Sequence, residues 1–138
     1  MVRSVICSSI GVIGSAIAYF FGGFDNAIIT LFIFICIDYI TGMIVAGVFH
    51  KSTKTETGSL NSKIGWIGFC RKCVTLLFVG VGHRLDIQLG CNYIRDAVCI
   101  GFMLNELISI VENAGLMGIK LPAVLTKAID ILKQKESD

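Results

Sequence analysis

The sequence is poor in charged residues and contains almost no proline. Charged side chains make up 16% of its 138 residues, whereas soluble domains usually carry about 25%. Hydrophobic residues make up 54% and the mean hydropathy is +0.79. The single proline leaves long stretches free to form uninterrupted helices. This composition argues against an ordinary water-soluble domain and favours an all-α integral membrane protein, with one membrane domain over residues 1–138.

Motifs that carry enzyme chemistry are also missing. The sequence has no nucleotide-binding glycine loop, no Ser/His/Asp set and no basic patch with interleaved aromatics. Cys70 and Cys73 form a C-x-x-C pair, but no second Cys or His pair accompanies it, so packing is favoured over redox or metal chemistry. His50 and His83 are isolated at the ends of apolar segments. We therefore expect no enzyme activity, cofactor, metal site or nucleic-acid partner.

Long apolar segments are the main positive signal. Residues 27–49 form a run of 23 that is long enough to cross a bilayer. Residues 64–81 and 93–111 are further candidates, each interrupted by a few charged side chains. Residues 4–21 are close to the lower length limit for a span. The sequence predicts three transmembrane helices and this borderline N-terminal fourth.

The N-terminal segment carries a stripe of small residues. Arg3 and the sequence at 16–18 (A-I-A) resemble a cleavable signal peptide, which is one interpretation of residues 1–18. The other is a permanent helix whose small side chains recur every three or four residues, so that another helix can approach closely. The stripe consists of Ser4, Ser8, Gly11, Ser15, Ala18 and Gly22. Gly65 and Gly68 are predicted to serve the same helix-packing role in the third span.

The distribution of lysines predicts the topology. The loop at 50–63 and the C-terminal tail are rich in lysine, whereas residues 22–26 have no basic side chain. Positively charged loops stay in the cytoplasm, so this loop and the C-terminus are predicted to face the cytoplasm of a multi-pass protein of the bacterial inner membrane. Residues 121–135 begin with Leu-Pro, and helical spacing would place their apolar side chains on one side and their charged side chains on the other. They predict an amphipathic cytoplasmic helix.

Polar side chains inside the spans are the candidate functional residues. Asp38 lies near the middle of the run at 27–49, where a charge is costly unless it is paired or used. Helical periodicity at 100° per residue gives each of the last three spans one face that collects polar or small side chains. The predicted intramembrane cluster contains Asp38, Thr41, Gly42, Arg71, Lys72, Asn105, Glu106, Ser109, Glu112 and Asn113.

Depth suggests which of these residues meet. At 1.5 Å per residue from the cytoplasmic ends, Asp38 lies roughly 16 Å deep, Lys72 roughly 12 Å and Glu106 roughly 10 Å. One hypothesis is an ion-pair cluster in which Asp38 meets Lys72 or Arg71, with Glu106 nearby. The alternative is that Arg71 and Lys72 reach the lipid headgroups and that the third span begins near Cys73. The sequence does not decide between the two.

Three motifs in register resemble one family. D-Y-I-T-G at 38–42, S-K-I-G-W-I-G-F-C-R-K at 62–72 and N-E-L-I-S-I-V-E-N at 105–113 resemble the phage lysis and toxin-secretion holins, which include clostridial toxin-secretion members. G-L-M-G-I-K-L-P at 115–122 and G-G-F-D at 22–25 extend the resemblance to nearly the whole chain.

This resemblance implies a function. Holins assemble into homo-oligomers in the cytoplasmic membrane and open lesions, which release an endolysin for phage lysis of the host cell or help to export a toxin. The polar arc at 105–113 is then the best candidate for the lining of the opening. Two alternatives remain open: a small proton-coupled transporter that uses the carboxylates of Asp38 and Glu106, and a passive subunit whose polar residues only hold helices together.

Overall fold

The fold is all-helical, as predicted. The computed structural model describes residues 1–137, and no strand occurs among them. A single turn of π-helix, η1, extends the second helix toward the 50–61 loop. The elements are α1 (Val2–Phe21), α2 (Asn26–Ile44), η1 (Val45–Phe49), α3 (Ser62–Leu89), α4 (Ile94–Leu116) and α5 (Ala123–Ser137).

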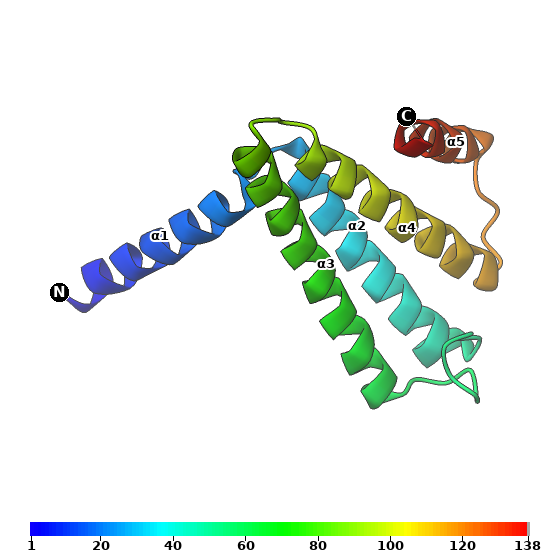
Figure 1. The fold of residues 1–138 in the computed structure, drawn as a ribbon. Coiled ribbons are helices and arrows are strands. Elements are labelled where there is room, and N and C mark those ends of the chain that lie inside the picture. The colour runs from blue at the N-terminus through cyan, green and yellow to red at the C-terminus, as the bar shows by residue number, and fades with distance from the viewer. Residues whose placement is uncertain (138) are drawn as a thin grey trace.

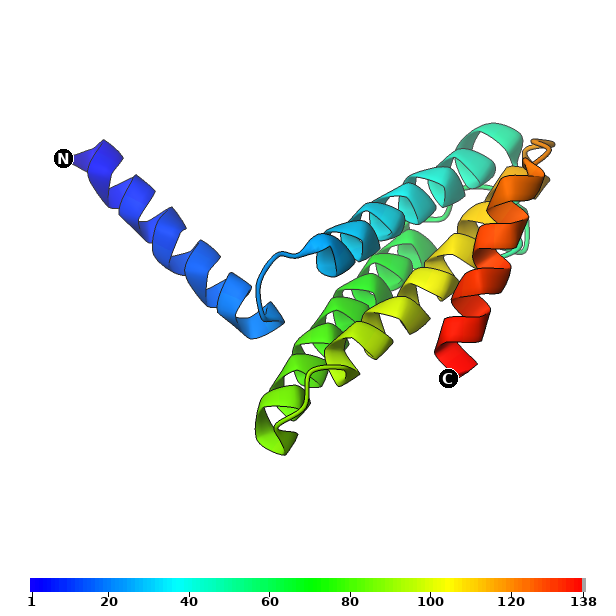
Figure 2. The same cartoon turned by 90° about the horizontal axis from the view of Figure 1, so that it is seen from above.

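Helices α2, α3 and α4 pack into a bundle. α2 and α4 run in the same direction and α3 runs in the opposite one, as Figures 1 and 2 show. Their contact is apolar at the end where α2 begins, and hydrophobic side chains from all three helices meet there. α5 folds back beside α4 (Figure 2). The buried core consists of Ile28, Leu31, Ile35, Val79, Cys99 and Met103.

The buried face of α2 explains where Asp38 lies. Ile28, Leu31, Ile35 and Asp38 are all buried and follow one another at intervals of three and four residues. This spacing marks a single face of a helix. Asp38 therefore continues the stripe that faces the partner helices, and its carboxylate is directed into the bundle rather than toward lipid.

Helix α1 stands apart from the bundle. None of its residues is buried, and both cartoon views show it projecting away from the other helices (Figures 1 and 2). Its C-terminal end makes the connection, because Phe20 lies against Gly80 and Gly22 lies against His83. Gly22 ends the helix in the left-handed conformation (φ 74°), which favours glycine. The helix is thus attached to the bundle at one end only.

Three helices are long and apolar enough to cross a membrane. They are α1, the continuous helix Asn26–Phe49 and α3. The borderline N-terminal helix is among the three and α4 is not, so the predicted span at 93–111 stays a prediction. α4 carries Arg95 and Glu106, among other charged side chains, and both are buried against neighbouring helices.

The observed helix bounds also extend the predicted ones. The third helix continues from the predicted end at residue 81 to Leu89, and the fourth continues from residue 111 to Leu116. The tail helix starts at Ala123, one residue after the proline, which agrees with the predicted amphipathic segment at 121–135. The added turns hold polar residues that hydropathy alone would place outside a span.

Candidate functional site

An ion-pair cluster joins the three bundle helices. Lys72 Nζ of α3 lies 2.6 Å from Asp38 Oδ2 of α2 and also forms an ion pair with Glu106 Oε2 of α4. The Asp38 side chain is 3% exposed, that of Glu106 10% and that of Lys72 17%. One ammonium group therefore bridges two carboxylates, and the cluster carries one more negative than positive group.

Asn113 completes the cluster from the last turn of α4. Its Nδ2 donates to Asp38 Oδ1 at 3.1 Å and to Thr41 Oγ1 at 3.0 Å. Thr41 in turn donates to the backbone oxygen of Asp38 at 3.1 Å. A Cβ on Gly42 would lie 3.7 Å from Asn113 Nδ2, so the small residue leaves room for the amide. Buried polar groups of this kind are stable only when they are hydrogen-bonded.

The two basic neighbours in α3 have different environments. Lys72 is directed into the bundle, whereas Arg71 is exposed and makes no ion pair within the described part of the chain. The ion-pair arrangement thus applies to Lys72. The position of Arg71 on the outer surface is compatible with the alternative, in which a basic side chain reaches the headgroups.

The predicted polar arc of α4 is divided between two sides. Glu106 and Asn113 face the bundle and are buried, Ser109 is half-buried, and Asn105 and Glu112 are exposed. Asn105 and Glu112 make no side-chain hydrogen bond or ion pair with the residues that the structure describes. The arc therefore has an inner edge with partners and an outer edge without them.

The predicted helix-packing residues have few contacts within one chain. Ser4, Ser8, Gly11 and Ser15 are all exposed on α1. In α3, Gly65 lies close to Tyr39, whose hydroxyl donates to the Gly65 carbonyl at 3.4 Å. A Cβ on Gly11 or on Gly68 would meet nothing within 4 Å. Close packing along this stripe stays a prediction that concerns a second chain.

The cysteines are all free thiols. Cys99 is buried in the core, as expected for a small apolar side chain. Cys70 and Cys73 are exposed on α3, where a membrane helix can present such side chains to lipid, and the packing role predicted for the pair stays a prediction.

A second polar cluster, which the sequence did not predict, lies at the opposite end of the bundle. Arg95, near the start of α4, makes a bidentate contact with the Asp25 carboxylate: Nη1 donates to Oδ2 at 2.6 Å and Nη2 donates to Oδ1 at 2.9 Å. Its Nε donates to the carbonyl of Phe21 at 2.6 Å, and its Nη2 donates to that of Gly23 at 3.3 Å. Arg95 thereby ties the α1–α2 turn to α4.

Asp86 fixes the adjoining corner between α3 and α4. Its two carboxylate oxygens accept from the backbone N–H groups of Ile94 and Arg95 at 2.9 and 3.0 Å, which satisfies donors at the start of α4. Asp86 lies within α3 and gives no local signal of its role, whereas Asp25 directly precedes α2, where an acidic residue is a typical helix cap. That signal identifies a cap but not a partner 70 residues away.

The environment of Asp25 leads to a titration prediction. The Arg95 side chain holds the pKa of this exposed turn carboxyl at about 2, below its usual value of 3.8. Since the pKa is depressed, the stabilisation from this pair is present above pH 3.8 and is lost as the pH falls through about 2. Carbon NMR of labelled aspartate in detergent micelles should show this inflection. Arg95→Gln should return the pKa toward 3.8, and an unchanged pKa in that variant would contradict the assignment.

Comparisons with known proteins agree with the predicted family. A profile of the bacteriophage holin family matches residues 15–134. An uncharacterized Listeria innocua protein is 38% identical over 136 residues, covering 96% of this chain and 91% of its own length. A probable holin of Bacillus phage phi105 is 33% identical over 117 residues, covering 84% of this chain and 80% of the phage protein. No solved structure matches the chain.

A clostridial protein is similar over nearly the same length. An uncharacterized 14.9 kDa protein from the nagH 3′ region of Clostridium perfringens is 33% identical over 126 residues, which cover 90% of this chain and 89% of that protein. The family profile includes both the helices that form the ion-pair cluster and the turn held by Arg95. The resemblance predicted from the three motifs is confirmed, and the chain belongs to the bacteriophage holin family.

Proposed function

We propose that the protein assembles into homo-oligomers in the bacterial cytoplasmic membrane and opens a water-filled path across it. This path would release a cell-wall hydrolase during host lysis or allow the export of a large toxin. The observation that carries the proposal is the outer edge of α4, where Asn105 and Glu112 are exposed and make no side-chain hydrogen bond or ion pair with the described residues, in a helix packed against the apolar α2 and α3.

The polar side chains on the two edges of α4 differ in whether they have hydrogen-bond or ion-pair partners within the subunit. Glu106 and Asn113 are bonded to Lys72 and Asp38 inside the subunit. A polar side chain is costly against acyl chains but acceptable against water or a polar protein neighbour. The outer edge therefore requires either an aqueous lumen or a second subunit, and a ring of subunits that turn this edge inward supplies both.

Helix α1 supports self-association. It projects from the bundle, has no buried residue and carries its small-residue stripe on an exposed surface. In lipid, small residues favour close helix–helix contact because the backbones can approach each other. The lysines of the 50–63 loop and of the tail are proposed to keep both segments in the cytoplasm.

The proposal is tested by making the outer edge of α4 apolar. The double variant Asn105→Leu/Glu112→Leu should insert and accumulate normally. It should no longer cause the abrupt collapse of membrane potential, and it should no longer cause lysis when a muralytic enzyme is co-expressed. Gln88→Leu is the matched control, since it makes the same type of change on an exposed site of α3. The control should retain full activity.

The alternatives predict other results. A transporter would show gradient-dependent flux that Glu106→Gln abolishes, without lysis when the enzyme is present. A passive subunit would leave the potential intact even in the unmodified protein. Either result, or full lytic activity in the double leucine variant, would overturn the proposed lining role of α4.

A further inference from the structure

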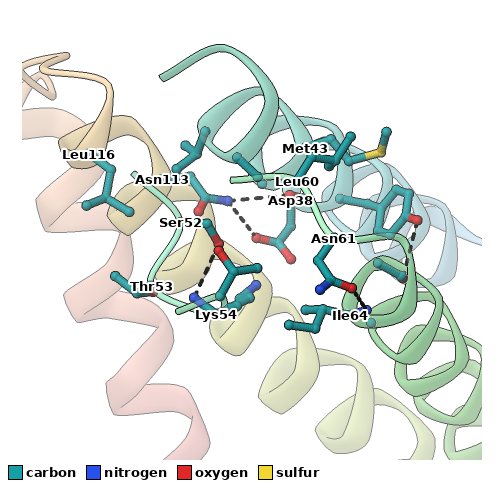
Figure 3. Close-up of a pocket in the computed structure, with 17 residues that line it drawn as sticks. Asp38, Met43, Ser52, Thr53, Lys54, Leu60, Asn61, Ile64, Asn113 and Leu116 are labelled. Carbon is teal, nitrogen blue, oxygen red and sulfur yellow. Dashed lines mark hydrogen bonds between the residues drawn. The ribbon is translucent and has the colours of Figure 1, made fainter. Parts of the chain in front are cut away.

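A cavity of about 90 Å³ lies next to Asp38, at the bundle end that carries the 50–61 loop (Figure 3). Asp38 lines it from α2, Gly65 from α3 and Asn113 from α4. The loop contributes Ser52 and Lys54 to the same lining (Figure 3). The cavity is therefore lined by both the bundle helices and the loop.

The cavity is both polar enough and large enough to hold water. About 10–15 Å³ of such space is enough for one water molecule, so the cavity has room for several. Asp38 accepts side-chain bonds from Asn113 at one oxygen and from Lys72 at the other, although a carboxylate has about four acceptor sites. Thr55, which also lines the cavity, has a buried hydroxyl without a hydrogen-bond partner among the described residues. Water would satisfy these groups.

The loop has a defined structure over the cavity. The backbone N–H of Ser52 donates to the Gly58 carbonyl at 3.0 Å, and that of Gly58 donates to the Thr55 carbonyl at 3.3 Å. Gly58 adopts a φ of 72°, and a Cβ there would lie 2.3 Å from the backbone oxygen of His50. Only glycine fits this close contact, so the loop can be opened selectively by substituting Gly58.

We propose that this cavity is a hydrated chamber through which Asp38 is reached by water and small ions from the loop side only, and that the 50–61 loop is its lid. The chamber belongs to a single subunit and is present before any lesion opens. It also reduces the cost of burying the carboxylate about 16 Å along the helix from Phe49, because water would bind the acceptor sites that Asn113 and Lys72 leave free.

Silver ions provide a small, charged probe of this access. Ag⁺ binds thiolates, which form in water but not in lipid. Gly42→Cys places a thiol in the chamber, where its Cβ makes only an ordinary contact at 3.7 Å. Ile40→Cys is the matched control, two residues away on an exposed, lipid-facing side of the same helix. After Ag⁺ treatment of sealed vesicles, denaturation and alkylation, peptide mass spectrometry gives the protection of each cysteine separately.

We expect Ag⁺ to protect Gly42→Cys at least tenfold faster than Ile40→Cys. The protection should occur only from the vesicle side that also exposes Glu56→Cys in the loop. Gly65→Cys, from the α3 wall of the chamber, is a second reporter with an ordinary contact at 3.8 Å. Equal rates at positions 40 and 42, with position 65 no faster, would overturn the proposal, as would access from the opposite side.

The lid is tested separately. Gly58→Ala should increase the Ag⁺ reaction rate at position 42 severalfold, because the added methyl group cannot coexist with the His50 carbonyl. An unchanged rate would exclude the loop as a lid. Since all vesicles are sealed and lesion-free, a negative result in the Ag⁺ experiment would not bear on the proposed oligomeric path. Conversely, a variant that is defective in lysis can still show rapid Ag⁺ protection at position 42.

Discussion

Replacing Lys72 with methionine should destabilise the protein more than any other single change at the site. It leaves Asp38 and Glu106 buried with no cation between them, and removal of one partner from a buried pair typically costs about 3–5 kcal/mol. We expect a strongly lowered midpoint of thermal unfolding in detergent and a large loss of protein from the membrane fraction.

Arg71→Met is the matched control for this prediction. Arg71 is the neighbouring basic residue of α3, is exposed and has no ion pair within the described residues, so its removal should change stability by about 0.5 kcal/mol or less. Adding Asp38→Asn and Glu106→Gln to the Lys72 variant should restore most of the stability, because no charge is then left buried. Equal effects of the two single variants would show that the cluster does not hold the helices together.

Replacing Gly80 with alanine should detach α1 from the bundle. An added Cβ would lie 2.0 Å from Cε1 of the Phe20 ring, so the ring must leave its position. Overpacking of this kind typically costs about 1–3 kcal/mol, and here the cost acts on the only end of α1 that touches the bundle. Proteolysis within residues 20–25 should accelerate about tenfold or more, while the far-ultraviolet circular dichroism stays unchanged.

Two further variants isolate the contact. Gly68→Ala makes the same change in the same helix at a position where a Cβ meets nothing within 4 Å, and it should cleave at the normal rate. Phe20→Ala combined with Gly80→Ala removes the clash but does not restore the contact of the Phe20 ring. This double variant should therefore recover only part of the protection from proteolysis. Equal cleavage of the Gly68 and Gly80 variants would contradict the structure at this point.

The sequence predicted the helices and much of the inner cluster because both follow from local rules. Apolar runs set the helices, and a 3.6-residue period places Asp38 on a buried face. Depth along antiparallel helices then brings Lys72 and Glu106 to similar heights. The choice between Lys72 and Arg71 was open, because the two differ by only 100° around the helix and each can reach several partners.

Other contacts could not be predicted because they depend on packing between distant segments. Arg95 looked like one more polar residue of the fourth span, yet it binds the turn around Asp25. The direction of α1 depends on the contacts of Phe20 with Gly80 and of Gly22 with His83, which no local pattern in the sequence indicates. The chamber beside Asp38 depends on how the loop folds, which hydropathy does not encode.

The one-ended attachment of α1 separates its energetics from those of the remaining helices. All six buried members of the hydrophobic core belong to α2, α3 and α4, and α1 contributes only Phe21 at its edge, so local unfolding of the rest of α1 leaves that core intact. A helix of this length reaches about 30 Å. Forces that bilayer thickness or lipid composition place on this arm therefore act first on the turn at Gly22 and Gly23, where Arg95 holds the carbonyls of Phe21 and Gly23, and not on the buried core.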